Sequence, residues 1–508
     1  MEISNGYKID LLIICGDMET MRNTNDMKYC LECPNKYKHM GDFYKYYTGI
    51  SIAPVLTIFI GGNHESSNYL QELPYGGWVS KNIYYLGYSG VIRVGGLRIG
   101  GLSGIYNSDF YRTGHYEIIP YNKVSLKSVY NVKKCEVEKI KLLNSMDLTN
   151  DVFDIFISHD WPNDIEYHGD TNLLFKIKPH FYNSSSKHIL GSPVNMNLLK
   201  SIKPRYWFSG HMHVKFFATV IHDENQNNND NDDDDCDNDI IDDNNDNSNN
   251  MQSGTSQYTL KQNKSSEQFN KLASMIQNQG SIRSTSSTSS TSSTSSTSST
   301  SEAATMSNKT EFVALDKCLP NRDFLHIMEI HPHPDSLKVK RKKDSSTTTT
   351  TTSSDSGSGS SSSSSDHENE IYISYDEDWL AIIRATHDQI PTNKYPDKNK
   401  LKFKKFYKPV DLKDERMIVR KLFMQNANGK QFESLSQLYR VPDNFEITAP
   451  AFIDDKRYPF YRIGNPQTDE LLRILHLKHK ITLPWIQQQQ QQYSSFSSTK
   501  EDQHQHHQ

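Results

Sequence analysis

Four apolar segments of the chain are each followed by side chains that could bind divalent cations or move protons. They are LLIIC followed by Gly-Asp, VLTIFI followed by GGNHE, DIFIS followed by His-Asp, and YWFS followed by GHMH. The side chains of interest are Asp17, Asn63, His64, His159, His211 and His213. Carboxylate, amide and imidazole groups suit borderline divalent ions. One such motif alone is typical of a turn or a hydrogen-bonded histidine, but four in this order predict a site for a pair of ions.

Strands must bring these motifs together, because they lie far apart in the sequence. Short β-rich runs that end in polar residues predict strands at Ile9–Cys15, Val55–Ile60, Asn82–Leu86, Gly96–Leu102, Asp154–Ser158 and Arg205–Ser209. The ends of strands converge at one edge of a sheet, so distant residues can share one site. Helical spacing in residues 131–148 predicts a buried stripe of Val132, Val137, Ile140 and Leu143. The pattern is typical of an α/β or layered β protein.

Composition divides the 508 residues into foldable and low-complexity parts. Residues 222–308 are rich in Asn and Asp and then in Ser and Thr, residues 342–366 are rich in Ser and Thr, and residues 485–508 are rich in Gln and His. Such segments bury too little apolar area to offset chain entropy, so we expect disorder there. Residues 1–221 and 309–484 remain as domains, and 378–385 is a further helix candidate.

Several protein classes are excluded by composition or disfavoured by it. No apolar run reaches the roughly 18 residues of a membrane helix, and no secretory signal pattern opens the chain. Six cysteines are too few for a disulfide scaffold and suggest a reducing compartment. The net charge of −5 becomes +7 without the acidic residues 223–250. A mildly basic body permits an anionic partner such as nucleic acid.

The ordered set of GD, GNHE, His and GHxH resembles the calcineurin-like metallophosphoesterases. Longer segments are similar to the family of RNA lariat debranching enzymes over nearly all of the chain outside the low-complexity runs. They include APVLTIFIGGNHESSNYLQELPYGGWVSKNIYYLG, RIGGLSGIYNSDFYRTGHYE, SHDWP, YWFSGHMHVKF, FVALDKCLP, YDEDWLAIIRAT and VPDNFEITAP. The resemblance implies an α/β fold: a layered β-sandwich metallophosphoesterase domain flanked by helices, with a smaller C-terminal extension and disordered inserts.

The resemblance also implies a role for each matching residue. Asp17 would bridge two metal ions, Asn63, His159 and His211 would complete one metal site, and His213 would serve the other. His64 would be the general acid that protonates the leaving 2′-oxygen. Residues 103–133 would form a recognition loop for branched RNA, which includes Tyr111, Arg112, His115 and Tyr116. The cofactors would be Fe²⁺, Zn²⁺ or Mn²⁺, which neutralise the phosphate and supply hydroxide at neutral pH.

The chain departs from the family pattern at its start. The family begins with a strand that ends in a Cys-x-His ligand pair, followed by a helix, whereas only Met1–Asp10 precede Leu11 here. Two explanations stay open: a start further upstream in the gene, which we favour, or a genuine short form with a weakened or one-metal site. The first is favoured because the other implied ligands are intact.

Our leading hypothesis is an enzyme that hydrolyses the 2′–5′ phosphodiester of excised intron lariats to linear RNA. A phosphoesterase with another substrate is one alternative, which would have no reason to carry the recognition loop. A non-catalytic or weakly active protein that binds branched RNA is the other, because the Cys-x-His pair is absent. We expect no membrane and no specific DNA partner. The substrate and the basic run KVKRKK at 338–343 suggest the nucleus, with the cytoplasm as a further location, and a solvated charged loop is the other interpretation of this run. The lysines of 394–408 suit RNA contact or an exposed face over a small core.

Overall fold

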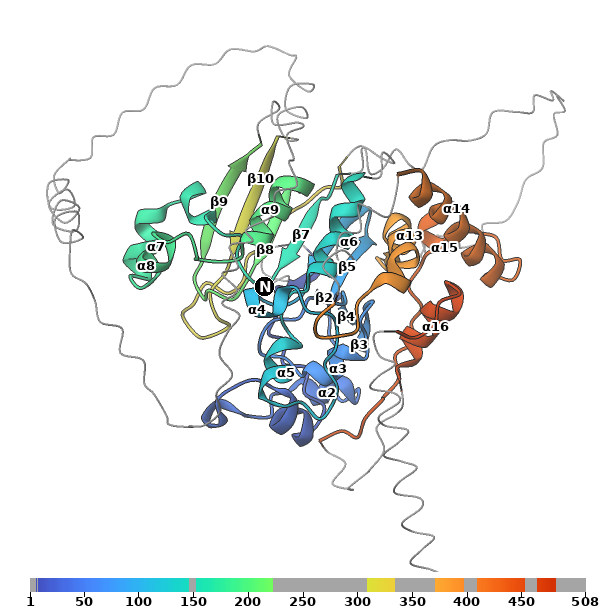
Figure 1. Cartoon of the computed structure of the whole chain (residues 1–508), viewed down its shortest axis with the longest axis horizontal. Coiled ribbons are helices and arrows are strands. Elements are labelled where there is room, and N and C mark those ends of the chain that lie inside the picture. Colours follow the sequence, from blue (N-terminus) through green and yellow to red (C-terminus); the bar gives the residue numbers. More distant parts are fainter. Residues whose placement is uncertain are drawn as a thin grey trace, which may run out of the picture. The chain divides into compact units, whose positions relative to one another are not determined.

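The computed structural model describes residue 6 and residues 8–145, 152–222, 308–333, 371–396, 409–452 and 464–480. The described parts of residues 1–223 and 304–508 form one compact unit (Figure 1). The segments that we predict to be disordered fall outside the described residues except at their boundaries. The basic run at 338–343 and most of the lysine-rich run at 394–408 also lie outside them.

Two β-sheets form the centre of the unit. The first has the strand order β1-β2-β4-β3, in which β1, β2 and β4 are parallel and β3 is antiparallel to β4. Its strands are β1 (Leu12–Ile14), β2 (Thr57–Phe59), β3 (Gly77–Ser80) and β4 (Ile83–Tyr85). Three of these strands match segments that the sequence predicts, and β3 does not, since GWVS offers only four residues without alternation.

The second sheet has seven strands in the order β11-β5-β6-β7-β8-β10-β9. Its strands are β5 (Ser89–Val94), β6 (Leu97–Leu102), β7 (Ile155–Ser158), β8 (Tyr206–Ser209), β9 (Phe216–Ile221), β10 (Lys309–Ala314) and β11 (Ile373–Tyr375). Strands β6, β7, β8 and β10 run parallel to one another. The predicted strands at β6, β7 and β8 are confirmed within a residue of their ends.

The two sheets pack face to face as a β-sandwich. The core between them contains Ile58 and Ile60 from the first sheet and Ile99, Ile155 and Ile157 from the second, all at most 1% exposed. These positions alternate along β2 and β7, because successive side chains of a strand point to opposite faces. The layered sandwich that the sequence predicts is therefore confirmed.

Helices cover the outer faces of the sheets. Near the N-terminus they are η1 (Asp26–Cys30), η2 (Asn35–Tyr37), α2 (Phe43–Tyr47) and α3 (Ser67–Gln71). In the middle they are α4 (Ser108–Tyr111), α5 (Lys123–Ser128), α6 (Lys134–Ser145), η3 (Ile165–His168), α7 (Thr171–Ile177), α8 (Phe181–Ser185) and α9 (Pro193–Ile202). Towards the C-terminus they are α13 (Glu377–Thr386), η4 (His387–Gln389), α14 (Pro409–Asn426), α15 (Leu435–Leu438) and α16 (Pro466–Ile474).

Helix α6 confirms the predicted buried stripe at Val137, Ile140 and Leu143, whereas Val132 is buried but precedes the helix. Val137 and Ile140 are fully buried, and Val132 and Leu143 are at most 9% exposed. Helix α13 confirms the predicted helix at 378–385 and begins one residue earlier, where the Asp376 side chain accepts a hydrogen bond from the Trp379 amide. No described helix is both long enough and apolar enough to cross a membrane.

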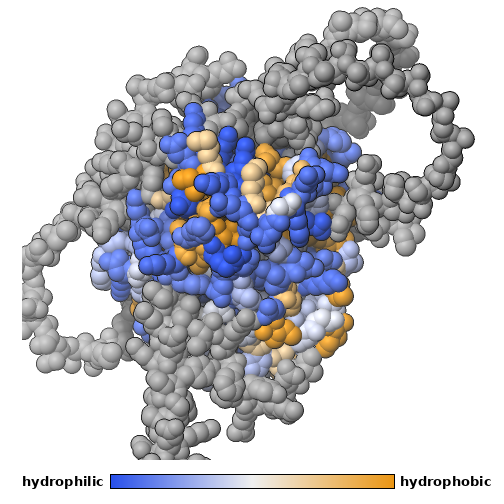
Figure 2. Space-filling view, turned by 90° about the vertical axis from the view of Figure 1, so that its right-hand side faces the viewer, coloured by the Kyte–Doolittle hydropathy of each residue, from blue (hydrophilic) through white to orange (hydrophobic). Residues whose placement is uncertain are grey.

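The C-terminal part is joined to the sandwich more closely than an extension packed on its surface. Strand β10 lies between β8 and β9 (Figure 1). Strand β11 pairs with β5 at the other end of the sheet. Arg98 on β6 donates hydrogen bonds to both carboxylate oxygens of Asp376, each 3.1 Å long. On the side that carries α14 and α16, hydrophilic residues predominate and apolar patches lie among them (Figure 2).

Buried ion pairs on α6 and before α13 predict a defined acid sensitivity. Burial raises the pKa of Glu136, but Lys139 and His115 outweigh it and lower that pKa to about 2, from 4.5. Arg98 and Arg93 likewise hold the pKa of Asp376 below its usual range against burial. A lowered folded-state pKa stabilises the fold above about pH 4.5, and this contribution is lost as the pH falls towards about 2.

We therefore expect the free energy of unfolding to fall between about pH 4.5 and pH 2, with Glu136 contributing roughly 3 kcal/mol of the change. Urea unfolding at several pH values measures this change. The Glu136→Gln variant should be less stable at pH 6 and should show a shallower dependence in the same window. An unchanged dependence in that variant would contradict the assignment.

Candidate active site

The site forms where four strands end. Asp17 follows β1, Asn63 and His64 follow β2, His159 follows β7, and His211 follows β8. Strands β1 and β2 run parallel in one sheet, and β7 and β8 run parallel in the other. The carboxyl ends of these two pairs therefore meet at one edge of the sandwich, as expected for sites of layered α/β proteins.

The structure brings the predicted ligands into contact. His159 Nε2 lies 3.1 Å from Asn63 Oδ1 and 3.5 Å from Asp17 Oδ1. The rings of His159 and His211 have centroids 5.0 Å apart. His213 is within electrostatic reach, because the charges of Asp17 and His159 both act on its pKa, although burial dominates and lowers it. Residues from four separate motifs therefore lie close together at one site.

The backbone at three of these positions is in the left-handed region. The φ angles are 55° at Asp17, 59° at His211 and 52° at His213. This conformation is uncommon outside glycine and costs free energy, and it concentrates at functional sites where the fold imposes it. The turns after β1 and β8 therefore direct these side chains at a cost in backbone energy.

Gly62 leaves no room for a side chain beside the ligands. A Cβ atom there would lie 2.1 Å from Asp17 Oδ1 and 2.8 Å from His159 Cε1. Gly16 is similar, since its Cβ would meet His159 Nδ1 at 2.3 Å and its φ is 98°. The glycines of both motifs therefore allow the ligands to approach one another closely.

We expect Gly62→Ala to lower phosphodiesterase activity at least about tenfold without removing any ligand, because small displacements at a catalytic centre are costly. The measurement is the steady-state rate with added divalent metal, alongside circular dichroism to confirm folding. Gly41→Ala is the matched control, because a Cβ there meets nothing within 4 Å. Equal activity of the two variants would contradict a tight ligand cluster.

The residues present fit divalent metal ions. His159 Nδ1 lies 2.6 Å from the carbonyl oxygen of Cys15 and carries a hydrogen there, so Nε2, on the side of Asp17 and Asn63, is the atom that would bind a metal ion. Burial lowers the pKa of His159, but Asp17 outweighs it and raises that pKa, so a metal ion at Nε2 would replace the proton that Asp17 favours. Burial and the neighbouring His159 lower the pKa of His211 to about 4, which keeps that imidazole neutral and able to coordinate. Burial raises the pKa of Asp17, but His159 outweighs it, so Asp17 is a carboxylate.

His64 is held in a defined orientation beside the ligands. Its backbone amide donates to Asp17 Oδ1 at 2.8 Å, and its Nδ1 lies 2.8 Å from the carbonyl oxygen of Glu32. Because a carbonyl only accepts, Nδ1 carries the hydrogen in this contact. The segment before η2 therefore fixes the imidazole, a contact that sequence motifs do not reveal because it involves a backbone carbonyl.

Glu65 joins two turns of the site, a role that the sequence motifs do not indicate. Its Oε1 accepts from the amides of Met18 and Gly62, at 2.9 Å and 3.2 Å, and so joins the turns after β1 and β2. Burial and the charge of Asp17 raise its pKa to about 8. Its place within GGNHE was the available signal, and its hydrogen bonds hold together the turns that carry Asp17 and Asn63.

Residues 103–133 lie next to this site, but they are not uniformly available to RNA. Tyr111 and Tyr116 are half-buried, and so is Arg112. His115 is 5% exposed, stacks on Tyr88 with ring centroids 4.4 Å apart, and places Nε2 2.9 Å from Glu136 Oε1. Direct RNA binding by the three half-buried residues stays a prediction, whereas His115 lies inside the protein.

His115, Cys135 and Glu136 place three potential ligand atoms within 4.8 Å of one another. The Lys139 ammonium already lies 2.5 Å from Glu136 Oε2, and burial dominates in raising the pKa of the Cys135 thiol well above its usual range. A protonated thiol and a paired carboxylate make this group an ion-pair cluster that anchors the segment.

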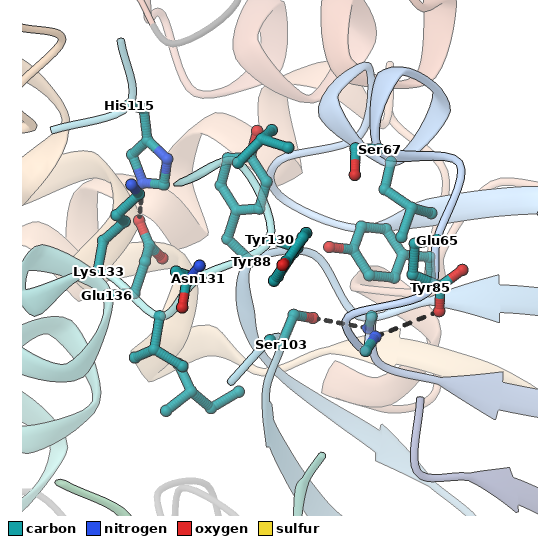
Figure 3. A pocket seen from close by; sticks show the side chains of 17 residues that line it. Glu65, Ser67, Tyr85, Tyr88, Ser103, His115, Tyr130, Asn131, Lys133 and Glu136 are labelled. Carbon is teal, nitrogen blue, oxygen red and sulfur yellow. Dashed lines mark hydrogen bonds and ion pairs between the residues drawn. The ribbon is translucent and has the colours of Figure 1, made fainter. Parts of the chain in front are cut away.

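A cavity of about 30 Å³ lies between this cluster and the turn after β2 (Figure 3). Figure 3 shows His115 and Glu136 at one end and Glu65 at the other, with Tyr88 and Tyr130 between them. The volume suits one or two water molecules and is too small for a nucleobase. Tyr130 is half-buried, and besides burial the charges of Glu32 and Asp17 raise its pKa to about 12, so it lies within electrostatic reach of Asp17.

Comparisons with known proteins agree with this geometry. The model of the calcineurin-like phosphoesterase family matches residues 2–215, and the model of the lariat debranching enzyme C-terminal domain matches residues 307–480. The sandwich and its ligand cluster define a metallophosphoesterase of the calcineurin-like class. Enzymes of this class depend on divalent metal ions.

Curated relatives extend the match to both parts together. The chain is 34% identical to the lariat debranching enzyme of Schizosaccharomyces pombe, over 93% of this chain and 92% of that one. It is 35% identical to the enzyme of Danio rerio and 34% to that of Homo sapiens, over 94% and 91% of this chain. It spans 62% of the length of each of those two relatives. The chain belongs to the lariat debranching enzyme family.

Proposed function

We propose that this protein hydrolyses the 2′–5′ phosphodiester at the branch point of excised intron lariat RNA and releases linear RNA. The observation that carries the proposal is the convergence of Asp17, Asn63, His159 and His211 beside an oriented His64, in a chain of this family. The fused C-terminal domain and the segment 103–133 favour a branched RNA over a generic phosphoester. From this substrate we also propose a nuclear location, with the cytoplasm as a further location.

Different residues of the chain have different roles in the proposed hydrolysis. Asp17, Asn63, His159, His211 and His213 would hold the metal, and we propose two ions, iron, zinc or manganese. When bound, such ions neutralise the phosphate and lower the pKa of water. With hydrogens on both ring nitrogens, His64 supplies the Nε2 proton to the departing 2′-oxygen and is left neutral, with its Nδ1 hydrogen still on the Glu32 carbonyl. Asp17 also positions His64 through the backbone amide of that residue.

The test is a cleavage assay of the full chain on a synthetic 2′–5′ branched RNA with added Fe²⁺, Zn²⁺ or Mn²⁺. A linear 3′–5′ RNA of the same sequence is the matched control substrate, and excess chelator is the metal control. We expect metal-dependent release of the branch and little cleavage of the linear RNA. Binding of branched RNA without cleavage at any metal concentration would contradict the proposal and favour a binding protein.

A further inference from the structure

A short segment of the C-terminal domain forms backbone hydrogen bonds with the middle of the recognition segment. The amide of Gly114 donates to the carbonyl of Asn393 at 3.0 Å, and the amide of His115 donates to the carbonyl of Pro391 at 2.9 Å. Neither carbonyl belongs to a helix or a strand of the sheets. The two parts, which are more than 270 residues apart in sequence, therefore meet through paired main chains.

Position 114 must be glycine because any larger residue would be too close to the backbone of Pro391 and Asn393. A Cβ atom at this position would lie 2.5 Å from the Pro391 carbonyl oxygen and 2.6 Å from that of Asn393. Both are backbone atoms, so they cannot move aside as a flexible side chain would. The φ angle of Gly114 is not in the left-handed region, so an alanine would be tolerated by the backbone and excluded only by the C-terminal segment.

Both partners of this contact are firmly anchored. On one side, Lys133 Nζ lies 2.8 Å from Glu117 Oε1 and 2.8 Å from Thr113 Oγ1, and all three residues are at most 5% exposed. On the other side, Ile390 is 1% exposed in the main hydrophobic core. The contact therefore joins two segments whose neighbouring residues are buried and hydrogen-bonded.

The contact of Pro391 and Asn393 with Gly114 and His115 lies next to residues that we expect to bind RNA. The Lys394 ammonium lies 6.0 Å from the ring centre of Tyr116, and the Lys133 ammonium lies 5.6 Å from it. Cations at this distance stabilise an aromatic ring. Tyr111, Arg112 and Tyr116, which lie within three residues of Gly114 or His115 in the sequence, are half-buried.

We propose that Pro391–Lys394 of the C-terminal domain is a positioning segment for branched-RNA recognition. It holds the backbone of Gly114 and His115, and thereby gives the adjacent half-buried residues one conformation before RNA arrives. A pre-ordered binding segment loses less entropy when the ligand binds, so its loss weakens binding more than it slows chemistry. This inference rests on the proposed function. The segment acts on recognition through the backbone of Gly114 and His115, so its role is positioning and not catalytic.

The experiment compares the full chain with its Gly114→Ala and Gly41→Ala variants, with Mn²⁺ added. Gly41 is the control because its Cβ would meet nothing within 4 Å and its φ is also outside the left-handed region. For Gly114→Ala we expect KM for 2′–5′ branched RNA to rise about tenfold while kcat changes less than about threefold. Amide hydrogen exchange in residues 105–118 should become faster, and Gly41→Ala should match the wild type in both readouts.

Other outcomes overturn the inference. An unchanged KM in Gly114→Ala would show that the contact does not serve recognition, and a fall in kcat at constant KM would place its effect on the chemical centre. If Gly114→Ala does not fold, Pro391→Gly loosens the same segment and should raise KM in the same direction, and an unchanged KM would again overturn the inference. If the wild type binds branched RNA but does not cleave it, the proposed function fails, and the dissociation constants of the variants decide the positioning role.

Discussion

Replacing His64 with alanine is expected to slow hydrolysis of 2′–5′ branched RNA by about 10²- to 10⁴-fold, the usual contribution of a positioned general acid. The 2′-oxygen is a poor leaving group as an alkoxide, so its departure depends on a proton. His64 is oriented for this by the carbonyl of Glu32 and by the contact of its own amide with Asp17. KM should change little, because the variant removes an interaction made in the transition state.

A second substrate separates general acid catalysis from damage to the metal site. Bis(p-nitrophenyl) phosphate releases a stable anion that needs no proton, so His64→Ala should retain most of its activity on this compound. Asp17→Asn is the matched control, and it should lose activity on both substrates because Asp17 is a predicted ligand. If His64→Ala lost both activities equally, the residue would support the ligand cluster and would not be the proton donor.

Replacing Arg22 with methionine is expected to lower the free energy of unfolding by about 3–5 kcal/mol, because it leaves buried carboxylates without a cation. Arg22 is fully buried, with Nε 2.8 Å from Asp26 Oδ2 and Nη1 2.7 Å from Glu72 Oε1. Its Nη1 also donates to Thr448 Oγ1 at 3.1 Å. The guanidinium therefore joins the N-terminal part of the sandwich to a distant C-terminal segment.

Urea unfolding at neutral pH measures this loss. Arg473→Met is the matched control, because Arg473 pairs with Glu470 at 2.8 Å but its side chain is 60% exposed, and surface pairs contribute at most about 1 kcal/mol. Restoring charge balance by combining Arg22→Met with Asp26→Asn and Glu72→Gln should recover part of the stability. Similar losses in the Arg22 and Arg473 variants would show that burial of the Arg22 network carries no special cost.

The sequence by itself determined the strands that carry the site and the residue types at their ends. The apolar runs before Asp17, Asn63 and His159 are short, bounded by polar turns, and become β1, β2 and β7 within three residues of the predicted ends. The prediction of these strands is correct because a buried strand has a locally apolar sequence. Family motifs then supplied roles that no composition could have shown.

Strands and helices without a distinctive local sequence pattern were not predicted. Strand β9 follows the GHMH motif directly, and β10 begins at Lys309 with mixed polar residues, so neither is bounded by turn signals. Helix α14 is polar over much of its length, and its place is defined by packing against α13. These elements gain their stability from neighbours in the fold, which a local sequence pattern does not record.

Only the tertiary structure decided which candidates act together. It placed His115 inside the protein against Glu136, because the ion pair and the stacking on Tyr88 depend on segments 20 to 30 residues away. It also revealed the Glu32 carbonyl on His64 and the Asn393 carbonyl on Gly114, which are backbone contacts that any residue type could make. The sequence specifies which side-chain groups are available at each position. Contacts between distant backbone segments form only when the chain folds, so no residue type predicts them.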